Sequence, residues 1–242
     1  MKGEIYFKMY KKSVKIIDRS KIIEELNRNL KLDVNNTAIV TIDMHRGHLD
    51  PKVATEPCKD EDCERVVKNS KDLLDFSRGK GIPIIHVVMI NRIKDGVSLE
   101  AKNVKFWQSF ANIQQSLALQ KSSSINEHNL EGKIQTEIIP ELYKESDYVI
   151  NNKKRLSSFY GTDLEILLRV LGIETTVLIG VNTNTCVLCS AFESFNRDYT
   201  TIVISDCVAS MYGEDLHIFG LQNISRCLGW VLTVEEFKKK IC

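Results

Sequence analysis

The chain has 242 residues and a formal net charge of +1, with 43% hydrophobic and 27% charged residues. This length suits one large α/β domain or two small ones, and the composition is that of an ordinary globular protein. The balanced charge gives no sign of a nucleic-acid or membrane ligand, and no apolar stretch is long enough to cross a bilayer. Because no apolar signal segment opens the chain, we expect a cytoplasmic protein.

Cysteine usage points to the same compartment. An odd number of cysteines in a chain of this size argues against a disulfide framework and favours a reducing environment. The seven cysteines are Cys58, Cys63, Cys186, Cys189, Cys207, Cys227 and Cys242.

Apolar runs that lack period-two alternation predict buried strands, and stretches with helical periodicity lie between them. This alternation predicts a three-layer α/β domain, an open parallel sheet of about six strands with helices on both faces. The predicted strands are 37–43, 82–90, 147–150, 175–180, 200–205 and 229–234. The predicted helices are 61–79, 163–171, 187–195 and 215–227.

Two segments fall outside this alternation, within what we expect to be a single domain over 1–242. Residues 1–35 read as a peripheral segment with a helix at 17–30. Residues 92–131 are too long for an unstructured loop, and the apolar spacing within 104–119 predicts a helix there. We interpret 92–131 as a lid-like excursion over the strand ends, with an oligomer contact as an equal alternative.

Three ionisable residues follow predicted strands: Asp43, Lys153 and Cys186. Ligands of open parallel sheets bind outside the carboxyl ends of the strands, so these side chains can converge. Cys186 also opens a predicted helix, whose N-terminus favours a thiolate nucleophile and offers N–H donors to an oxyanion. Taken singly, each residue has a plainer reading as a turn residue, a solvated cation or a small buried hydrophobe.

Three motifs make the combination specific. An apolar strand runs into Asp-Met at 41–44, Lys-x-Arg-x-Ser-x-Phe-x-Gly-Thr-x-Leu lies at 153–164, and Gly-Val-x-Thr-x-x-Cys-Val lies at 180–187. From about residue 37 to its end, the chain resembles the isochorismatase-like cysteine hydrolases. This family includes nicotinamidases, N-carbamoylsarcosine amidohydrolases, biuret hydrolases and ureidoacrylate hydrolases.

The resemblance implies a Rossmann-like sheet and a catalytic triad of Asp43, Lys153 and Cys186. It further implies a cis peptide at Val181–Asn182 and an oxyanion hole formed by the backbone N–H groups of Asn182 and Cys186. The implied activity is hydrolysis of a small amide, carbamoyl or ureido compound through a thioester on Cys186. No cofactor is implied, and relatives commonly form homo-oligomers, so we expect a dimer or tetramer.

The chain departs from its relatives around the first motif. His45 stands where a glutamine is common, and His48 where a pocket aromatic is common. The two histidines also suggest a metal pair, but no third ligand has usable spacing, so we expect pocket histidines and no metal. The Asp-x-His metal motif of nicotinamidases is missing from the matching stretch 88–95, which removes the main reason to expect zinc.

Candidate substrate-binding residues come from the divergent segments and the second motif. We assign this role to His48, Arg92, Trp107 and Phe159. Arg92, together with the basic pair 154–155, is also suited to hold a substrate carboxylate.

Two other classes of function remain open. Cys186 and Cys189 form a C-x-x-C pair, which predicts a thiol–disulfide oxidoreductase in some folds. The chain also fits a family member that binds or scaffolds without catalysis. The triad argues against the second alternative, and the late position of the cysteine pair argues against the first.

Overall fold

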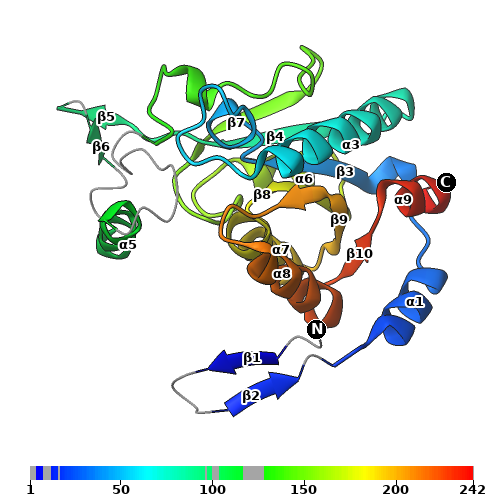
Figure 1. Ribbon diagram of the computed structural model, residues 1–242. Coiled ribbons are helices and arrows are strands. Elements are labelled where there is room, and N and C mark those ends of the chain that lie inside the picture. The colour runs from blue at the N-terminus through cyan, green and yellow to red at the C-terminus, as the bar shows by residue number, and fades with distance from the viewer. Residues whose placement is uncertain are drawn as a thin grey trace.

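The structure is a computed structural model that describes residues 4–7, 12–15, 17–95, 97–99, 104–116 and 128–241 (Figure 1). Its centre is a six-stranded, wholly parallel sheet with the order β10-β9-β8-β3-β4-β7. The predicted open parallel sheet is therefore confirmed. The strands are β3 (Thr37–Ile42), β4 (Ile84–Met89), β7 (Tyr148–Lys153), β8 (Thr175–Val181), β9 (Thr200–Ala209) and β10 (Trp230–Leu232).

The strand order reverses direction at the middle of the sheet. From β3 the chain builds outward through β4 to β7, then returns to β8 on the other side of β3 and continues to β9 and β10. A crevice forms outside the carboxyl ends of the strands at such a reversal, because the two connections leave in opposite directions. The site is thus expected between the ends of β3 and β8.

Helices cover both faces of the sheet (Figure 1). One face packs against α3 (Asp60–Gly79) and α9 (Val234–Lys240). The other face packs against α6 (Leu164–Val170), α7 (Leu188–Phe195) and α8 (Glu214–Cys227). The three-layer arrangement predicted from the sequence is confirmed.

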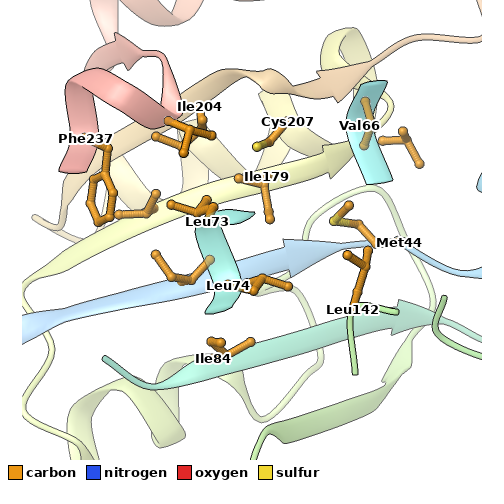
Figure 2. Close-up of a cluster of buried hydrophobic side chains, with 14 of the residues drawn as sticks. Met44, Val66, Leu73, Leu74, Ile84, Leu142, Ile179, Ile204, Cys207 and Phe237 are labelled. Atoms are coloured by element: carbon orange, nitrogen blue, oxygen red, sulfur yellow. The ribbon is translucent and has the colours of Figure 1, made fainter. Parts of the chain in front are cut away.

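The α3 face shows how helical spacing builds the core. Val66, Leu73 and Leu74 are fully buried and share one side of α3. Figure 2 shows Leu73 and Leu74 of α3 over the sheet, close to Ile179 and Ile84. Each such side chain removed from water stabilises the fold by about 2 kcal/mol.

Gly180 lets β8 and β3 approach each other next to the site. Its φ of 123° lies in a region that side chains avoid. A Cβ at this position would lie 2.0 Å from the carbonyl oxygen of Ile42. A side chain at residue 180 would therefore push apart the two strands whose ends form the crevice.

Several elements differ from the sequence prediction. The β1–β2 hairpin and α9 were not predicted, and Thr233 and Glu236 begin α9 with reciprocal capping hydrogen bonds where a longer strand was expected. The predicted helix at 104–119 is observed as α5, while 117–119 lie outside the described residues. The remaining elements are β1 (Glu4–Phe7), β2 (Lys12–Lys15), α1 (Ser20–Asn29), η1 (Val34–Asn36), α2 (Arg46–Leu49), β5 (Ile93–Lys94), β6 (Val97–Ser98), α5 (Lys105–Ser116) and η3 (Ile134–Thr136).

Among the described helices, none is both long enough and apolar enough to span a membrane.

Candidate active site

Asp43 lies immediately after β3, where the chain leaves the sheet. Its backbone has a φ of 52°, a left-handed conformation that is uncommon for a residue with a side chain. Its N–H donates to the carbonyl of Val87, and its Oδ1 accepts the N–H of Met89 at 2.8 Å. These two hydrogen bonds to the neighbouring strand β4 fix the carboxylate at the end of the sheet.

Lys153 is the last residue of β7 and reaches back over β4 toward Asp43. Its Nζ donates to Asp43 Oδ2 at 2.6 Å and to Cys186 Sγ at 3.4 Å. The side chain of Lys153 is fully buried and that of Asp43 is 1% exposed. The structure therefore brings together the three ionisable residues that the sequence placed after separate strands.

Cys186 lies in a π-helical turn, η4 (Thr183–Val187), between β8 and α7. The turn is closed by a hydrogen bond from the N–H of Val187 to the carbonyl of Asn182, five residues apart. The prediction of a thiol that opens a regular helix is thus modified, because the regular helix begins at Leu188. Wide turns of this kind are frequent at functional sites.

Burial by itself shifts the pKa of Cys186 and the pKa of Lys153 in opposite directions. It raises the pKa of the Cys186 thiol far above the ordinary value, although the Lys153 ammonium acts in the other direction. Burial by itself lowers the pKa of Lys153, but the Asp43 carboxylate outweighs it and the pKa of Lys153 is raised. The sequence suggested a thiolate, whereas the structure favours a resting state with a neutral thiol and an ammonium–carboxylate pair.

A cavity of about 390 Å³ opens at these groups. Asp43 and Cys186 line it, and so does Asn182, which follows a cis peptide at Val181–Asn182 as the resemblance implies. Of the four predicted substrate-binding residues, His48 and Trp107 also line the cavity. Its size fits a small-molecule ligand.

The structure does not bring the other two predicted substrate-binding residues to this cavity. Phe159 is 4% exposed and lies in the core under α6 and α7, with the guanidinium of Arg197 5.0 Å from its ring centre. Arg92 is solvent-exposed and is not among the described residues that line the cavity. Lys154, which donates to the carbonyl of Ile90, is likewise not among them.

One wall of the cavity was missed by the sequence reasoning. Glu56 and His128 lie beside His48, with 4.9 Å between the ring centres of the two histidines. Burial lowers the pKa of His48 and of His128 to about 4, so both are neutral at pH 7, and burial raises the pKa of Glu56. No local pattern could have found this wall, because tertiary structure alone joins residues 72 positions apart such as Glu56 and His128.

A model of the isochorismatase domain matches residues 37–236. The chain belongs to the isochorismatase family. The match begins at the first residue of β3 and covers all six strands of the central sheet.

Individual relatives agree with this membership. Over 211 residues the chain is 24% identical to the ureidoacrylate amidohydrolase RutB of Agrobacterium fabrum, covering 86% of this chain and 91% of that protein. The RutB protein of Methylobacterium radiotolerans is 35% identical over 104 residues, and this stretch spans only 40% of that relative.

Solved structures show the same fold. An isochorismatase-like hydrolase from Alkaliphilus metalliredigens superposes with a TM-score of 0.67 at 28% identity, over 85% of this chain and 98% of that chain. The N-carbamoylsarcosine amidase of Thermoplasma acidophilum superposes with a TM-score of 0.63 at 25% identity, over 83% and 97%.

Proposed function

We propose that this isochorismatase-family protein is a cysteine-dependent amidohydrolase that cleaves a small amide, carbamoyl or ureido compound through a thioester on Cys186. The observation that carries the proposal is the contact of Lys153 Nζ with both Asp43 Oδ2 and Cys186 Sγ, at 2.6 and 3.4 Å, beside a cavity of small-molecule size. The names of the RutB relatives and of the amidase neighbour support the class of reaction.

In the first half of the reaction, Asp43 acts as the general base. Because the buried thiol is neutral at rest, it must lose its proton as Sγ attacks the substrate carbonyl carbon. Asp43 Oδ2 and Cys186 Sγ both contact Lys153 Nζ, which places the carboxylate beside the thiol as the proton acceptor. The ammonium of Lys153 stabilises the negative charge that moves onto the sulfur.

The tetrahedral intermediate carries an oxyanion, for which we propose the backbone N–H groups of Asn182 and Cys186 as donors. The side chain of Asn182 is anchored, since its Oδ1 accepts the N–H of Met211 at 2.9 Å. That anchor holds the backbone of Asn182 in place while charge develops.

Asp43 then returns the proton to the leaving nitrogen, and the amine or ammonia departs as the thioester forms. An amide nitrogen is a poor leaving group until it is protonated, so one residue serves as base and then as acid. In the second half, Asp43 removes a proton from water as its oxygen attacks the thioester carbon. The carbon–sulfur bond then breaks, the acid product leaves, and Asp43 returns the proton to the Cys186 sulfur.

The disulfide alternative is weaker on geometric grounds. Cys186 and Cys189 are both free thiols. Of the two, only Cys186 contacts Lys153 and is among the described residues that line the cavity, as a single amidase nucleophile requires.

The decisive experiment is an ammonia-release screen over primary amides, N-carbamoyl amino acids, biuret and ureidoacrylate. We expect at least one to be hydrolysed, and mass spectrometry of a quenched reaction should show an acyl adduct on the Cys186 peptide. Cys186→Ala should abolish turnover.

Cys189→Ala serves as the matched control and should retain most of the activity. A requirement for both cysteines would instead support the oxidoreductase. Failure of every compound to release ammonia would support a non-catalytic role.

A further inference from the structure

Three side chains with metal-binding atoms meet on the wall of the cavity next to the proposed nucleophile. They are His48 from α2, Glu56 from the loop after α2, and His128 from the end of the 92–131 excursion. Each offers one ligand atom, and these atoms all lie within 4.8 Å of one another. We propose that His48, Glu56 and His128 bind a divalent transition-metal ion of the zinc type.

The hydrogen bonds of the first histidine fix its tautomer. His48 Nδ1 lies 2.8 Å from the carbonyl oxygen of Glu56, and a carbonyl can only accept, so Nδ1 carries the hydrogen. Its Nε2 therefore keeps a lone pair. A metal-bound histidine uses this arrangement, with one ring nitrogen on the ion and the other donating to a carbonyl or carboxylate.

His128 is held in the same form. The amide Nδ2 of Asn129 donates to His128 Nε2 at 2.8 Å, so the ring hydrogen is on Nδ1, which lies 2.6 Å from Thr55 Oγ1. An ion on Nε2 would replace the contact with the Asn129 amide. That amide has an oxygen, Oδ1, that is buried without a hydrogen-bond partner, and turning the amide over would present this oxygen to the ion.

The spacing fits ligands around one ion. His128 Nε2 and Glu56 Oε2 are 3.5 Å apart, which is long for a hydrogen bond. Two ligands on a tetrahedral ion with bonds of about 2.1 Å are roughly 3.4 Å apart. The widest separation is at most 4.8 Å, so it must close by about 1.4 Å or less when the ion binds.

The ligand types select the metal. Two imidazoles and one carboxylate suit zinc and its neighbours in the first transition row, whereas magnesium and calcium prefer oxygen ligands alone. A set of two histidines and one glutamate also leaves coordination positions free for water or a substrate atom. Those positions border the cavity, because the three residues line it together with Asp43 and Cys186.

The ion would change the charge of the cavity. The described residues that line the cavity include two acids, Asp43 and Glu56, but no lysine or arginine. A divalent cation on the Glu56 wall would supply the positive charge that this wall lacks. It would let the cavity accept an electron-rich or anionic substrate group beside the reacting carbonyl.

This site does not use the positions of the Asp-x-His motif after the second predicted strand. Asn91, which belongs to that stretch, contacts the cluster: its Nδ2 donates to the carbonyl of His128 at 2.9 Å. Asn91 thus orients a proposed ligand from behind.

The test is equilibrium metal binding without substrate, so that its outcome is independent of the amidase proposal. The full-length, tag-free protein is stripped with a chelator and titrated with cobalt(II), followed by visible absorption, and with zinc, followed by calorimetry. We expect one equivalent to bind, with ligand-field bands and without a thiolate charge-transfer band. A large excess of magnesium should not compete.

The variants locate the ion. His48→Gln, Glu56→Gln and His128→Gln should each weaken zinc binding by about tenfold or more. Cys186→Ser and His217→Gln, which alter a neighbouring thiol and a histidine outside the cavity, should bind as the wild type does. Circular dichroism checks that each variant folds. If a histidine variant does not fold, the nearly isosteric Glu56→Gln variant tests whether this cluster binds the ion.

Three results would overturn the proposal. They are the absence of stoichiometric binding to the wild-type protein, undiminished binding to Glu56→Gln, and loss of binding in Cys186→Ser, which would assign the ion to the thiolate.

Discussion

Two buried charge clusters lie at opposite ends of strand β7, and only one of them borders the cavity. At the far end, just before β7, Asp147 accepts two hydrogen bonds from Arg78, at 3.1 and 2.7 Å, and its Oδ2 lies 3.2 Å from His86 Nε2. At the near end, Lys153 binds Asp43 beside the thiol. We refer to the first group, Arg78, His86 and Asp147, as the edge cluster, and to the proposed catalytic residues Asp43, Lys153 and Cys186 as the catalytic cluster.

The two clusters differ in the hydrogen-bond partners of their carboxylates. The backbone N–H of Lys144 adds a further hydrogen bond to Asp147, so its oxygens are saturated by fixed donors. Although burial raises the pKa of Asp147, the hydrogen bonds from His86, Arg78 and Lys144 lower it well below the ordinary value. Asp43 instead faces a neutral thiol that can give up a proton. A buried ion pair therefore marks a reactive site only when a transferable proton and a cavity accompany it.

The sharpest test of this contrast replaces one carboxylate at a time by its amide. Asp43→Asn keeps the shape of the side chain but removes the base, so we expect kcat to fall by about 10³-fold. Steady-state ammonia release on the best substrate measures the loss, and near-normal turnover in Asp43→Asn would remove the distinction between the clusters.

The protonation state of the catalytic cluster gives the next largest effect. Because burial raises the pKa of Cys186, the thiolate fraction should grow about tenfold per pH unit, and alkylation by iodoacetamide about 100-fold from pH 7 to 9. Quantitative mass spectrometry of the Cys186 peptide follows the rate, with the exposed Cys227 as internal reference. A rate that is already flat at pH 7 would mean a permanent ion pair, like that of the edge cluster.

The amide substitution in the edge cluster should act on stability alone. Asp147→Asn leaves Arg78 without its charged partner and should lower the free energy of unfolding by about 2–3 kcal/mol, less than for a fully buried pair because Arg78 is partly exposed. Chemical denaturation measures this change, and kcat should stay within about twofold of the wild type.

The pH dependence of that loss has a definite sign. A lowered carboxyl pKa contributes stability that is complete above the unfolded-state pKa of Asp and disappears as the pH falls through the folded-state value. The gap between wild type and Asp147→Asn should thus be full at pH 7 and narrow below about pH 4. A gap that widens in acid would contradict the assignment.

The smallest expected effects separate two aromatic residues that the sequence grouped together. Trp107→Ala removes part of the cavity wall and should raise KM by about tenfold with little change in stability. Phe159→Leu removes ring contacts in the core and should cost about 1–2 kcal/mol with KM unchanged. Steady-state kinetics and thermal unfolding are measured on both variants. A raised KM in Phe159→Leu would show that Phe159 contacts the substrate.

The sheet could be predicted because its strands are continuous apolar runs, and their ends located Asp43 and Cys186. Other elements failed for identifiable reasons. Thr233 and Glu236 carry a capping signal for α9, but the apolar residues that precede them predict a strand reaching to residue 234. Phe159 belongs to the same motif as Lys153, but its position in the sequence does not show whether its ring faces the cavity or the core. The Glu56–His128 wall depends on tertiary contact alone.

The position of Lys153 on an outer strand has a further consequence. β7 has a neighbour on one side only, and Tyr148 and Val149 at its start are exposed. Edge strands open locally at a lower free-energy cost than central strands do. Warming should therefore separate Lys153 from Asp43 and Cys186 and abolish turnover at a temperature where the central strands remain folded. Thermal inactivation would then precede global melting, and amide exchange along β7 would report the working range of the enzyme.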